Sequence, residues 1–308
     1  MEPNKLKEKM KGVLALLVTP FKDDLDLDLE GLKQNVDFLI ENKVPGLIPT
    51  GSTGEFSSLT LEEHKEVIKT VVDKANGKAL VVPGTAHSST KVTIELTKYA
   101  EDVGADGAMI VPPYYLVGDD EGFYNHYKQV ADQVNIGIML YNNPHTSKIC
   151  MSFNLLNRLS KIDNIIAIKE VSGNVNYFLK VIKTFRDRWA VIPTAETPLT
   201  LLGYIFGASP ALITMEWNPK KSIEFLEEAA IKRNYEKAYK MIEECFEPFN
   251  ILYERYMAKG IPGYIQYTKA ALDMLGRVGG RVRPPLTDLN YNEKEELKKV
   301  LDKLGLLP

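Results

Sequence analysis

Asn164-Ile165-Ile166-Ala167-Ile168-Lys169-Glu170-Val171-Ser172-Gly173-Asn174 contains an apolar run that ends in a lysine. Its unbroken Ile and Ala residues are typical of a β-strand buried on both faces, as in a parallel sheet. A lysine at the end of such a strand loses hydration, which lowers its pKa and favours a neutral, nucleophilic amine. Alternatively, Lys169 extends its ammonium group into water. Other parts of the sequence must decide between these interpretations.

Seven further apolar runs resemble this one, and amphipathic helical stretches separate them. Each strand but the last leads into a helix after a short loop. The eight expected strands are Val13–Val18, Gly46–Pro49, Ala79–Pro83, Gly107–Val111, Ile136–Tyr141, Ile165–Lys169, Ala190–Thr194 and Ala211–Thr214. Eight successive strand–helix units predict an α/β protein with the (β/α)8 TIM-barrel architecture.

From about Pro219 the strand pattern stops and only helical patterns follow. The expected helices are Lys220–Arg233, Tyr235–Tyr256, Ile261–Leu275 and Glu293–Leu304. The sequence therefore predicts a catalytic barrel domain over residues 1–218 and a C-terminal helical domain over residues 219–308.

Composition excludes several classes of partner and cofactor. The 38 basic and 41 acidic residues are interspersed and give a net charge of −3, so we expect no nucleic-acid partner. No apolar run reaches the ~20 residues of a membrane helix and the start is not a secretory signal, which predicts a cytoplasmic protein without a membrane partner. Cys150 and Cys245 lie far apart in sequence, and neither they nor the histidines show metal-ligand spacing. The glycines match no nucleotide-binding pattern, so we expect neither a metal nor a nucleotide cofactor.

In a barrel, functional residues lie where the strands end and in the loops that follow. The second strand is followed by Gly51-Ser52-Thr53-Gly54, whose backbone N–H groups and hydroxyls suit a small carboxylate, although such a loop is also an ordinary turn. The fourth strand is followed by Tyr114-Tyr115 and the fifth ends at Tyr141. These tyrosines either pack at the barrel rim or, beside Lys169, move protons.

Four motifs together resemble one enzyme family. They are Gly51-Ser52-Thr53-Gly54-Glu55, Pro113-Tyr114-Tyr115, Tyr141-Asn142-x-Pro144 and Ile168-Lys169-Glu170-x-Ser172-Gly173. In this order and spacing they resemble the dihydrodipicolinate synthase/N-acetylneuraminate lyase family of class I aldolases over nearly the whole chain. The resemblance favours the nucleophilic interpretation of Lys169.

The resemblance implies a set of roles. Lys169 forms a covalent Schiff base with pyruvate or another 2-oxo acid, so no separate cofactor is expected. The loop at Gly51, Ser52 and Thr53 holds the carboxylate, and Tyr141 is the acid/base. Tyr115 matches a family tyrosine that reaches into a neighbouring subunit's site, which implies a homo-oligomer, either a tetramer or a dimer.

Departures from the family pattern bear on the second substrate. The lysine-biosynthetic synthases have an arginine five residues after the strand-five tyrosine, where it binds the aldehyde's carboxylate, and this chain has Thr146. A threonine hydroxyl does not replace a bidentate guanidinium. The segment Pro193–Thr197 differs as well, and Thr194 adds bulk there. We expect Asn143, His145, Thr194 and Glu196 to contact substrate.

The sequence thus predicts a Schiff-base lyase, an aldolase or a dehydratase, acting on a 2-keto-3-deoxy sugar acid or a related 2-oxo acid. Authentic dihydrodipicolinate synthase is the alternative, disfavoured by Thr146. A non-catalytic sensor that binds an oxo acid is an alternative of another class. Adduct formation with pyruvate and borohydride separates a working lysine from this last alternative.

Overall fold

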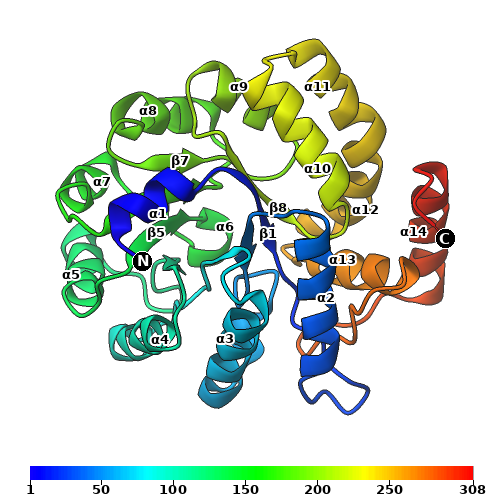
Figure 1. Ribbon diagram of the computed structural model, residues 1–308, viewed down its shortest axis with the longest axis horizontal. Helices are drawn as coiled ribbons and strands as arrows, with labels where there is room; N and C mark the ends of the chain where they lie inside the picture. Colours follow the sequence, from blue (N-terminus) through cyan, green and yellow to red (C-terminus); the bar gives the residue numbers. More distant parts are fainter. Residues whose placement is uncertain (308) are drawn as a thin grey trace.

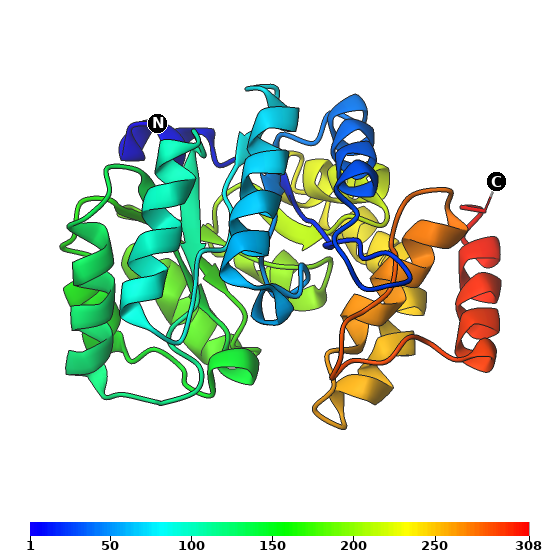
Figure 2. The ribbon, with the colours of Figure 1, turned by 90° about the horizontal axis from the view of Figure 1, so that it is seen from below.

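The computed structural model describes residues 1–307, which form a closed barrel of parallel strands with helices around it and further helices on one side (Figures 1 and 2). The strands are β1 Gly12–Leu16, β2 Gly46–Ile48, β3 Leu80–Val81, β4 Gly107–Ile110, β5 Gly137–Asn142, β6 Ile165–Glu170, β7 Ala190–Ile192 and β8 Ala211–Met215. All eight expected strands are confirmed within two residues at either end. Their side chains are almost all buried because the barrel interior covers one face and the helices cover the other.

Two four-stranded parallel sheets close into the barrel. Their strand orders are β3-β2-β1-β8 and β4-β5-β6-β7. A parallel bridge from Gly84 to Met109 joins β3 to β4, and one from Thr194 to Ile213 joins β7 to β8. In the β5–β6 pair, Tyr141 lies opposite Lys169. The predicted barrel is therefore present, and its register brings the two principal candidate residues together.

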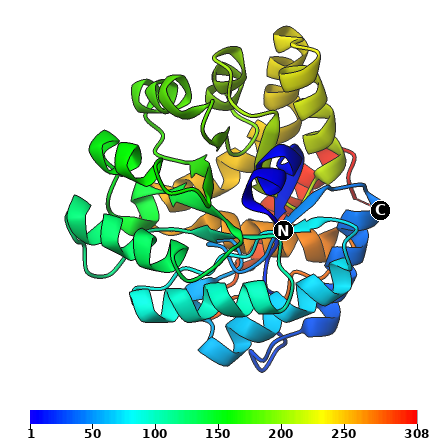
Figure 3. The ribbon, with the colours of Figure 1, turned by 60° about the vertical axis from the view of Figure 1, so that its left-hand side comes forward.

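Helices surround the barrel in the expected alternation with the strands (Figure 3). They are α2 Leu29–Glu41, the short 3-10 helix η1 Phe56–Ser58, α3 Leu61–Ala75, α4 Thr90–Asp102, α5 Asp120–Ala131, α6 Pro144–Ser147, α7 Phe153–Leu159, α8 Val175–Phe185, α9 Pro198–Ile205 and α10 Pro219–Leu226. The first helix, α1 (Pro3–Lys9), packs against β5 and β6 with Leu6 fully buried. It covers the N-terminal end of these strands, so the accessible cavity lies at the other end.

The C-terminal part is helical, as predicted. After α10 come η2 Glu227–Ile231, α11 Tyr235–Met241, η3 Ile242–Phe246, α12 Glu247–Met257, α13 Gly263–Met274 and α14 Tyr291–Lys303, of which η2 and η3 are π-helical. Figure 2 shows α13 and α14 side by side beyond the barrel. The division into residues 1–218 and 219–308 stays a prediction. Helix α10 packs against β1 and β8, so by its contacts it completes the outer ring of the barrel.

A buried ion pair joins α13 to the loop that follows β2. Lys269 Nζ lies 2.5 Å from Glu55 Oε1, and both side chains are almost completely buried. Arg283 adds a second link, since its guanidinium donates to both carboxylate oxygens of Glu63 at 2.7 and 2.5 Å. Removing one partner of a buried pair leaves an uncompensated charge, so such contacts fix the positions of the elements they join. These contacts hold α13 and the segment that follows it against the loop after β2 and against α3.

Candidate active site

Lys169 lies inside the barrel at the end of β6. Only 3% of the residue is exposed, and Nζ stands 3.9 Å from the centroid of the Tyr141 ring. Burial lowers the pKa of the Lys169 ammonium from its ordinary value of 10.5, while the Tyr141 phenol opposes this effect. The lysine does not extend into water, so the second interpretation of the sequence is wrong. A buried amine of lowered pKa is the form that attacks a carbonyl carbon.

The orientation of Tyr141 is fixed by an amide. Asn143 Nδ2 donates to the phenol oxygen of Tyr141 at 2.7 Å and to Thr146 Oγ1 at 3.0 Å. Both amide hydrogens are used in this way, and the phenol oxygen accepts one of them. Asn143 therefore does not use the phenol's own hydrogen, which an acid/base group needs for proton transfer. Thr146 serves here to hold Asn143.

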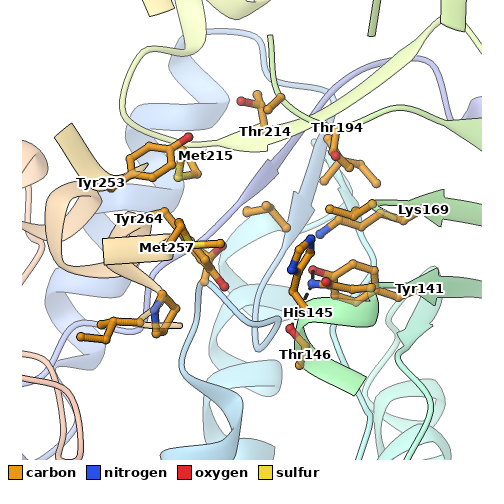
Figure 4. Close-up of a pocket in the computed structure, with 18 of the residues that line it drawn as sticks. Tyr141, His145, Thr146, Lys169, Thr194, Thr214, Met215, Tyr253, Met257 and Tyr264 are labelled. Carbon is orange, nitrogen blue, oxygen red and sulfur yellow. Dashed lines mark hydrogen bonds between the residues drawn. The ribbon is translucent and has the colours of Figure 1, made fainter. Parts of the chain in front are cut away.

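A cavity of about 480 Å³ contains these groups. Figure 4 shows Lys169, Tyr141 and His145 along one side of it. Of the residues expected in the site, the structure brings together at its walls Lys169, Tyr141, Thr53, Asn143, His145 and Thr194. Gly51, Ser52, Glu196 and Tyr115 are not among the described lining residues.

Thr53 belongs to the loop that follows β2. Gly51 O accepts hydrogen bonds from the backbone N–H groups of Gly54 at 3.0 Å and Phe56 at 3.4 Å, which makes the loop a tight turn. The Ser52 hydroxyl is buried and has no hydrogen-bond partner among residues 1–307. Its close neighbour is the phenol of Tyr264, whose pKa is raised by burial and lowered by Ser52. Ser52 thus lies between two residues that line the cavity, its chain neighbour Thr53 and the Tyr264 phenol.

Glu196 has a different place from the one expected. Its carboxylate accepts hydrogen bonds from Thr214 Oγ1 at 2.9 Å and from Ser222 Oγ, and only 4% of the residue is exposed. Burial raises the pKa of this carboxyl group. These contacts connect the loop after β7 to β8 and α10, so in this structure Glu196 supports the wall from behind and does not face the cavity.

Tyr115 lies on the outer surface. It is 81% exposed and is followed by Leu116 at 79% and Val117 at 51%. Three consecutive apolar side chains exposed in one loop suit a contact with another subunit. Within one chain Tyr115 does not reach the cavity, so its expected role depends on an oligomer and stays a prediction.

The sequence did not predict one wall of the cavity. Tyr253 and Met257 of α12 and Tyr264 of α13 line the side opposite Lys169 (Figure 4). Ile261, from the turn between these helices, also lines the cavity. The sequence pattern predicted only a break between the expected helices Tyr235–Tyr256 and Ile261–Leu275. Nothing in the sequence pattern indicated where that turn lies relative to the barrel.

The described residues show neither a metal site nor a membrane-spanning helix. No group of three or more His, Cys, Asp or Glu side chains within residues 1–307 is arranged to hold a metal ion. In the same part of the chain no helix is both long and apolar enough to cross a bilayer. The expectations of no cofactor and of a cytoplasmic location stay predictions.

The lowered pKa of Lys169 predicts a pH dependence. We expect the rate of adduct formation with pyruvate to rise with pH and to level off below the ordinary lysine pKa of 10.5, because the neutral amine becomes abundant at a lower pH.

Burying the charged form of Lys169 also destabilises the fold below pH 10.5. Lys169→Met should therefore unfold at higher denaturant concentration than the wild type at pH 7, with a gain that shrinks toward pH 10.5. Borohydride trapping across pH measures the rate of adduct formation, and urea titration across pH measures the stability of the two proteins. If the trapping rate has its midpoint at or above pH 10.5, the burial argument is contradicted.

Comparison with known proteins identifies the family of this chain. The sequence model of the dihydrodipicolinate synthetase family matches residues 9–304. The chain belongs to this family. Two curated relatives named 4-hydroxy-tetrahydrodipicolinate synthase are each 35% identical to it: that of Archaeoglobus fulgidus, with 96% of this chain and 99% of the relative covered, and that of Methanococcus vannielii, with 97% and 100% covered.

A solved structure agrees over the same range. The chloride-inhibited dihydrodipicolinate synthase of Acinetobacter baumannii complexed with pyruvate is 30% identical, with a TM-score of 0.86 and coverage of 97% of this chain and 100% of that one. Membership of the family makes this protein a class I aldolase-type lyase with the barrel fold predicted from its sequence.

Proposed function

We propose that the protein is a lyase that binds pyruvate or another 2-oxo acid as a Schiff base on Lys169, and that its substrate is a 2-keto-3-deoxy sugar acid or a related hydroxy-oxo acid. The observation that carries this proposal is the buried amine of Lys169 against the Tyr141 ring, 3.9 Å from its centroid, in the cavity of a family member. The pyruvate complex of the Acinetobacter baumannii relative supports the choice of oxo acid.

The chemistry begins with the neutral amine of Lys169, which attacks C2 of the oxo acid. The C2 oxygen takes up protons and leaves as water, and a protonated imine remains. The electron pair released when a bond at C3 breaks moves into the C2–N system and forms an enamine. In the aldol direction the enamine carbon attacks an aldehyde, whose oxygen becomes a hydroxyl by taking a proton.

Tyr141 supplies and removes the protons in these steps. Its ring lies beside the amine of Lys169, and its phenol oxygen accepts a hydrogen bond from the Asn143 amide. The hydroxyls of Ser52 and Thr53 hold the substrate carboxylate. His145 and Thr194, which also line the cavity, contact the remainder of the substrate near the lysine.

The protein assembles as a homo-oligomer, a dimer or a tetramer, through the loop that carries Tyr115. Its exposed Tyr115-Leu116-Val117 surface supports this part of the proposal. Size-exclusion chromatography with light scattering tests it, with Leu116→Asp as the variant expected to dissociate the assembly. A wild-type monomer at micromolar concentration would refute it.

A second candidate is 4-hydroxy-tetrahydrodipicolinate synthase, which is the name of the curated relatives. Against it stands the chemistry of the cavity. Among the described lining residues, Lys169 is the only Lys or Arg, and it is needed for the imine. The carboxylate of aspartate semialdehyde would thus lack a charge-assisted partner.

We therefore expect poor condensation of pyruvate with aspartate semialdehyde, slower by roughly 10²-fold or more than in an enzyme that carries the arginine. A coupled assay with dihydrodipicolinate reductase measures this reaction. The variant Thr146→Arg should increase the rate. A wild-type rate typical of the biosynthetic enzyme would establish the second candidate.

Membership of a lyase family disfavours the alternative of a non-catalytic sensor. An adduct with pyruvate shows that the lysine works, and turnover then separates a lyase from a sensor. A screen of sugar acids and other 4-hydroxy-2-oxo acids for pyruvate release, followed through lactate dehydrogenase, tests the proposal. Release above the background of the Lys169→Ala variant supports a lyase. Adduct formation with pyruvate but no turnover of any such substrate would favour the sensor.

A further inference from the structure

The cavity has two chemically different ends. Around Lys169 the walls carry hydroxyl, amide and imidazole groups from the barrel strands and loops. The opposite end is built by α12, α13 and the last residue of β8. Figure 4 shows Tyr253, Met257 and Tyr264 on this far side, with Met215 above them. A substrate fixed at Lys169 extends its distal carbons toward this far end.

Most of the hydroxyl groups at the far end are directed away from the cavity. Thr214 Oγ1 donates to Glu196 Oε2 at 2.9 Å, and Tyr253 Oη donates to Asn250 Oδ1 at 2.9 Å. The hydroxyl hydrogens of Thr214 and Tyr253 are therefore committed to the protein. The Tyr264 phenol, which lies beside the Ser52 hydroxyl, is left as the one hydroxyl of the far end that meets the substrate among the described lining residues, so a polyol there would find few partners.

The surface that remains at the far end is apolar. It consists of Met215, Met257, Ile261 and Pro262, and none of the described residues that line this end is Asp, Glu, Lys or Arg. Thr268 Oγ1 donates to the thioether of Met215 at 3.1 Å, which holds that side chain in place. Methionine packs well against flexible alkyl groups, whereas a sugar hydroxyl left without a partner here loses its hydration without compensation.

We infer that the physiological substrate is a 4-hydroxy-2-oxo acid whose chain beyond C4 is an uncharged alkyl group, and that Met257 is a specificity-determining residue for it. The oxo-acid end lies at Lys169 and the alkyl end lies against the thioethers. In cleavage the C3–C4 bond breaks, its electron pair enters the enamine, and the C4 hydroxyl loses its proton to leave an alkyl aldehyde. This inference rests on the proposed Schiff base at Lys169 and selects one class among its substrates.

The test is a comparison of aldehydes in the condensation direction. Butanal and glyceraldehyde have similar lengths, but hydroxyl groups in the second replace apolar atoms of the first. The assay follows pyruvate consumption by the intact protein. The kcat/KM for butanal should exceed that for glyceraldehyde roughly tenfold or more, because one or two changed groups on a substrate alter kcat/KM by this much in an apolar pocket. Aspartate semialdehyde should be poorer than butanal.

A matched pair of variants locates the preference. Met257→Gln places an amide of nearly the same shape in the wall, and the butanal preference should fall roughly tenfold. Ile251→Gln makes a comparable change on the same helix at a residue that is 56% exposed and outside the cavity lining, and it should keep the preference. Both variants should still trap pyruvate with borohydride.

The outcomes separate this inference from the proposed function. Faster turnover of glyceraldehyde or aspartate semialdehyde, with pyruvate trapping intact, would overturn the alkyl-group inference and leave the Schiff base in place. An equal loss of preference in both variants would remove Met257 from its role. A wild-type protein that traps no pyruvate would overturn the proposed function and the inference with it.

Discussion

The variant Lys169→Ala is expected to lose lyase activity entirely and to form no adduct with pyruvate and borohydride. The reason is that the imine nitrogen is the side-chain amine itself, and no other lysine or arginine lines the cavity among the residues the structure describes. The barrel should remain folded, because removal of a buried amine also removes the cost of desolvating it. Circular dichroism and urea titration check the fold.

Lys180→Ala is the matched control. Lys180 Nζ also stands 4.0 Å from an aromatic centroid, that of Phe153, but it lies on the outer helix α8 and does not line the cavity. This variant should keep full activity and adduct formation. If Lys169→Ala still forms the adduct while Lys180→Ala loses it, the nucleophile has been assigned to the wrong lysine.

Tyr141→Phe is expected to reduce turnover roughly 10²- to 10⁴-fold, the range found when a positioned acid/base is removed. The substitution keeps the ring beneath Lys169 and deletes only the hydroxyl that moves protons. Asn143 Nδ2 loses one acceptor but keeps Thr146 Oγ1, so the change in stability should be small. Steady-state kinetics of pyruvate release, with borohydride trapping as a function of time, measure the effect on both steps.

Tyr177→Phe provides the comparison for this second variant. The Tyr177 phenol donates to the backbone oxygen of Met151 at 2.6 Å and does not line the cavity. Its removal should lower stability slightly and leave turnover within a few-fold of the wild type. Near-normal turnover of Tyr141→Phe would transfer the acid/base role to another group, for example His145.

The sequence was sufficient to predict the barrel because every strand is buried on both faces and so appears as an apolar run of the right length. It was also sufficient to place Tyr141 near Lys169. The two residues end successive strands, and successive parallel strands in a barrel are neighbours. The observed register, in which they lie opposite each other, follows from that topology.

Sequence patterns did not predict which residues form the far wall of the cavity. An amphipathic helix shows which of its faces is buried, but not which distant element it packs against. The position of α13 depends on contacts such as the ion pair between Lys269 and Glu55, which joins residues far apart in the chain. Sequence patterns therefore did not predict that Met257 and Tyr264 line the cavity.

Glu196 illustrates a different difficulty. It follows a strand at the correct end of the barrel, and position alone suggested a substrate contact. Beyond the end of a strand, however, the alternation of side chains no longer determines direction. Local hydrogen bonds decide it instead, and here the hydroxyls of Thr214 and Ser222 hold the carboxylate behind the wall.

The central claim is that Lys169 forms the Schiff base, and peptide mapping after reductive trapping tests it most directly. Wild-type protein is incubated with pyruvate and borohydride, digested and analysed by mass spectrometry. We expect one adduct per chain, with the mass of a reduced pyruvate, on the peptide that contains Lys169. An adduct on a different lysine, or none under conditions that modify a known class I aldolase, would contradict this account.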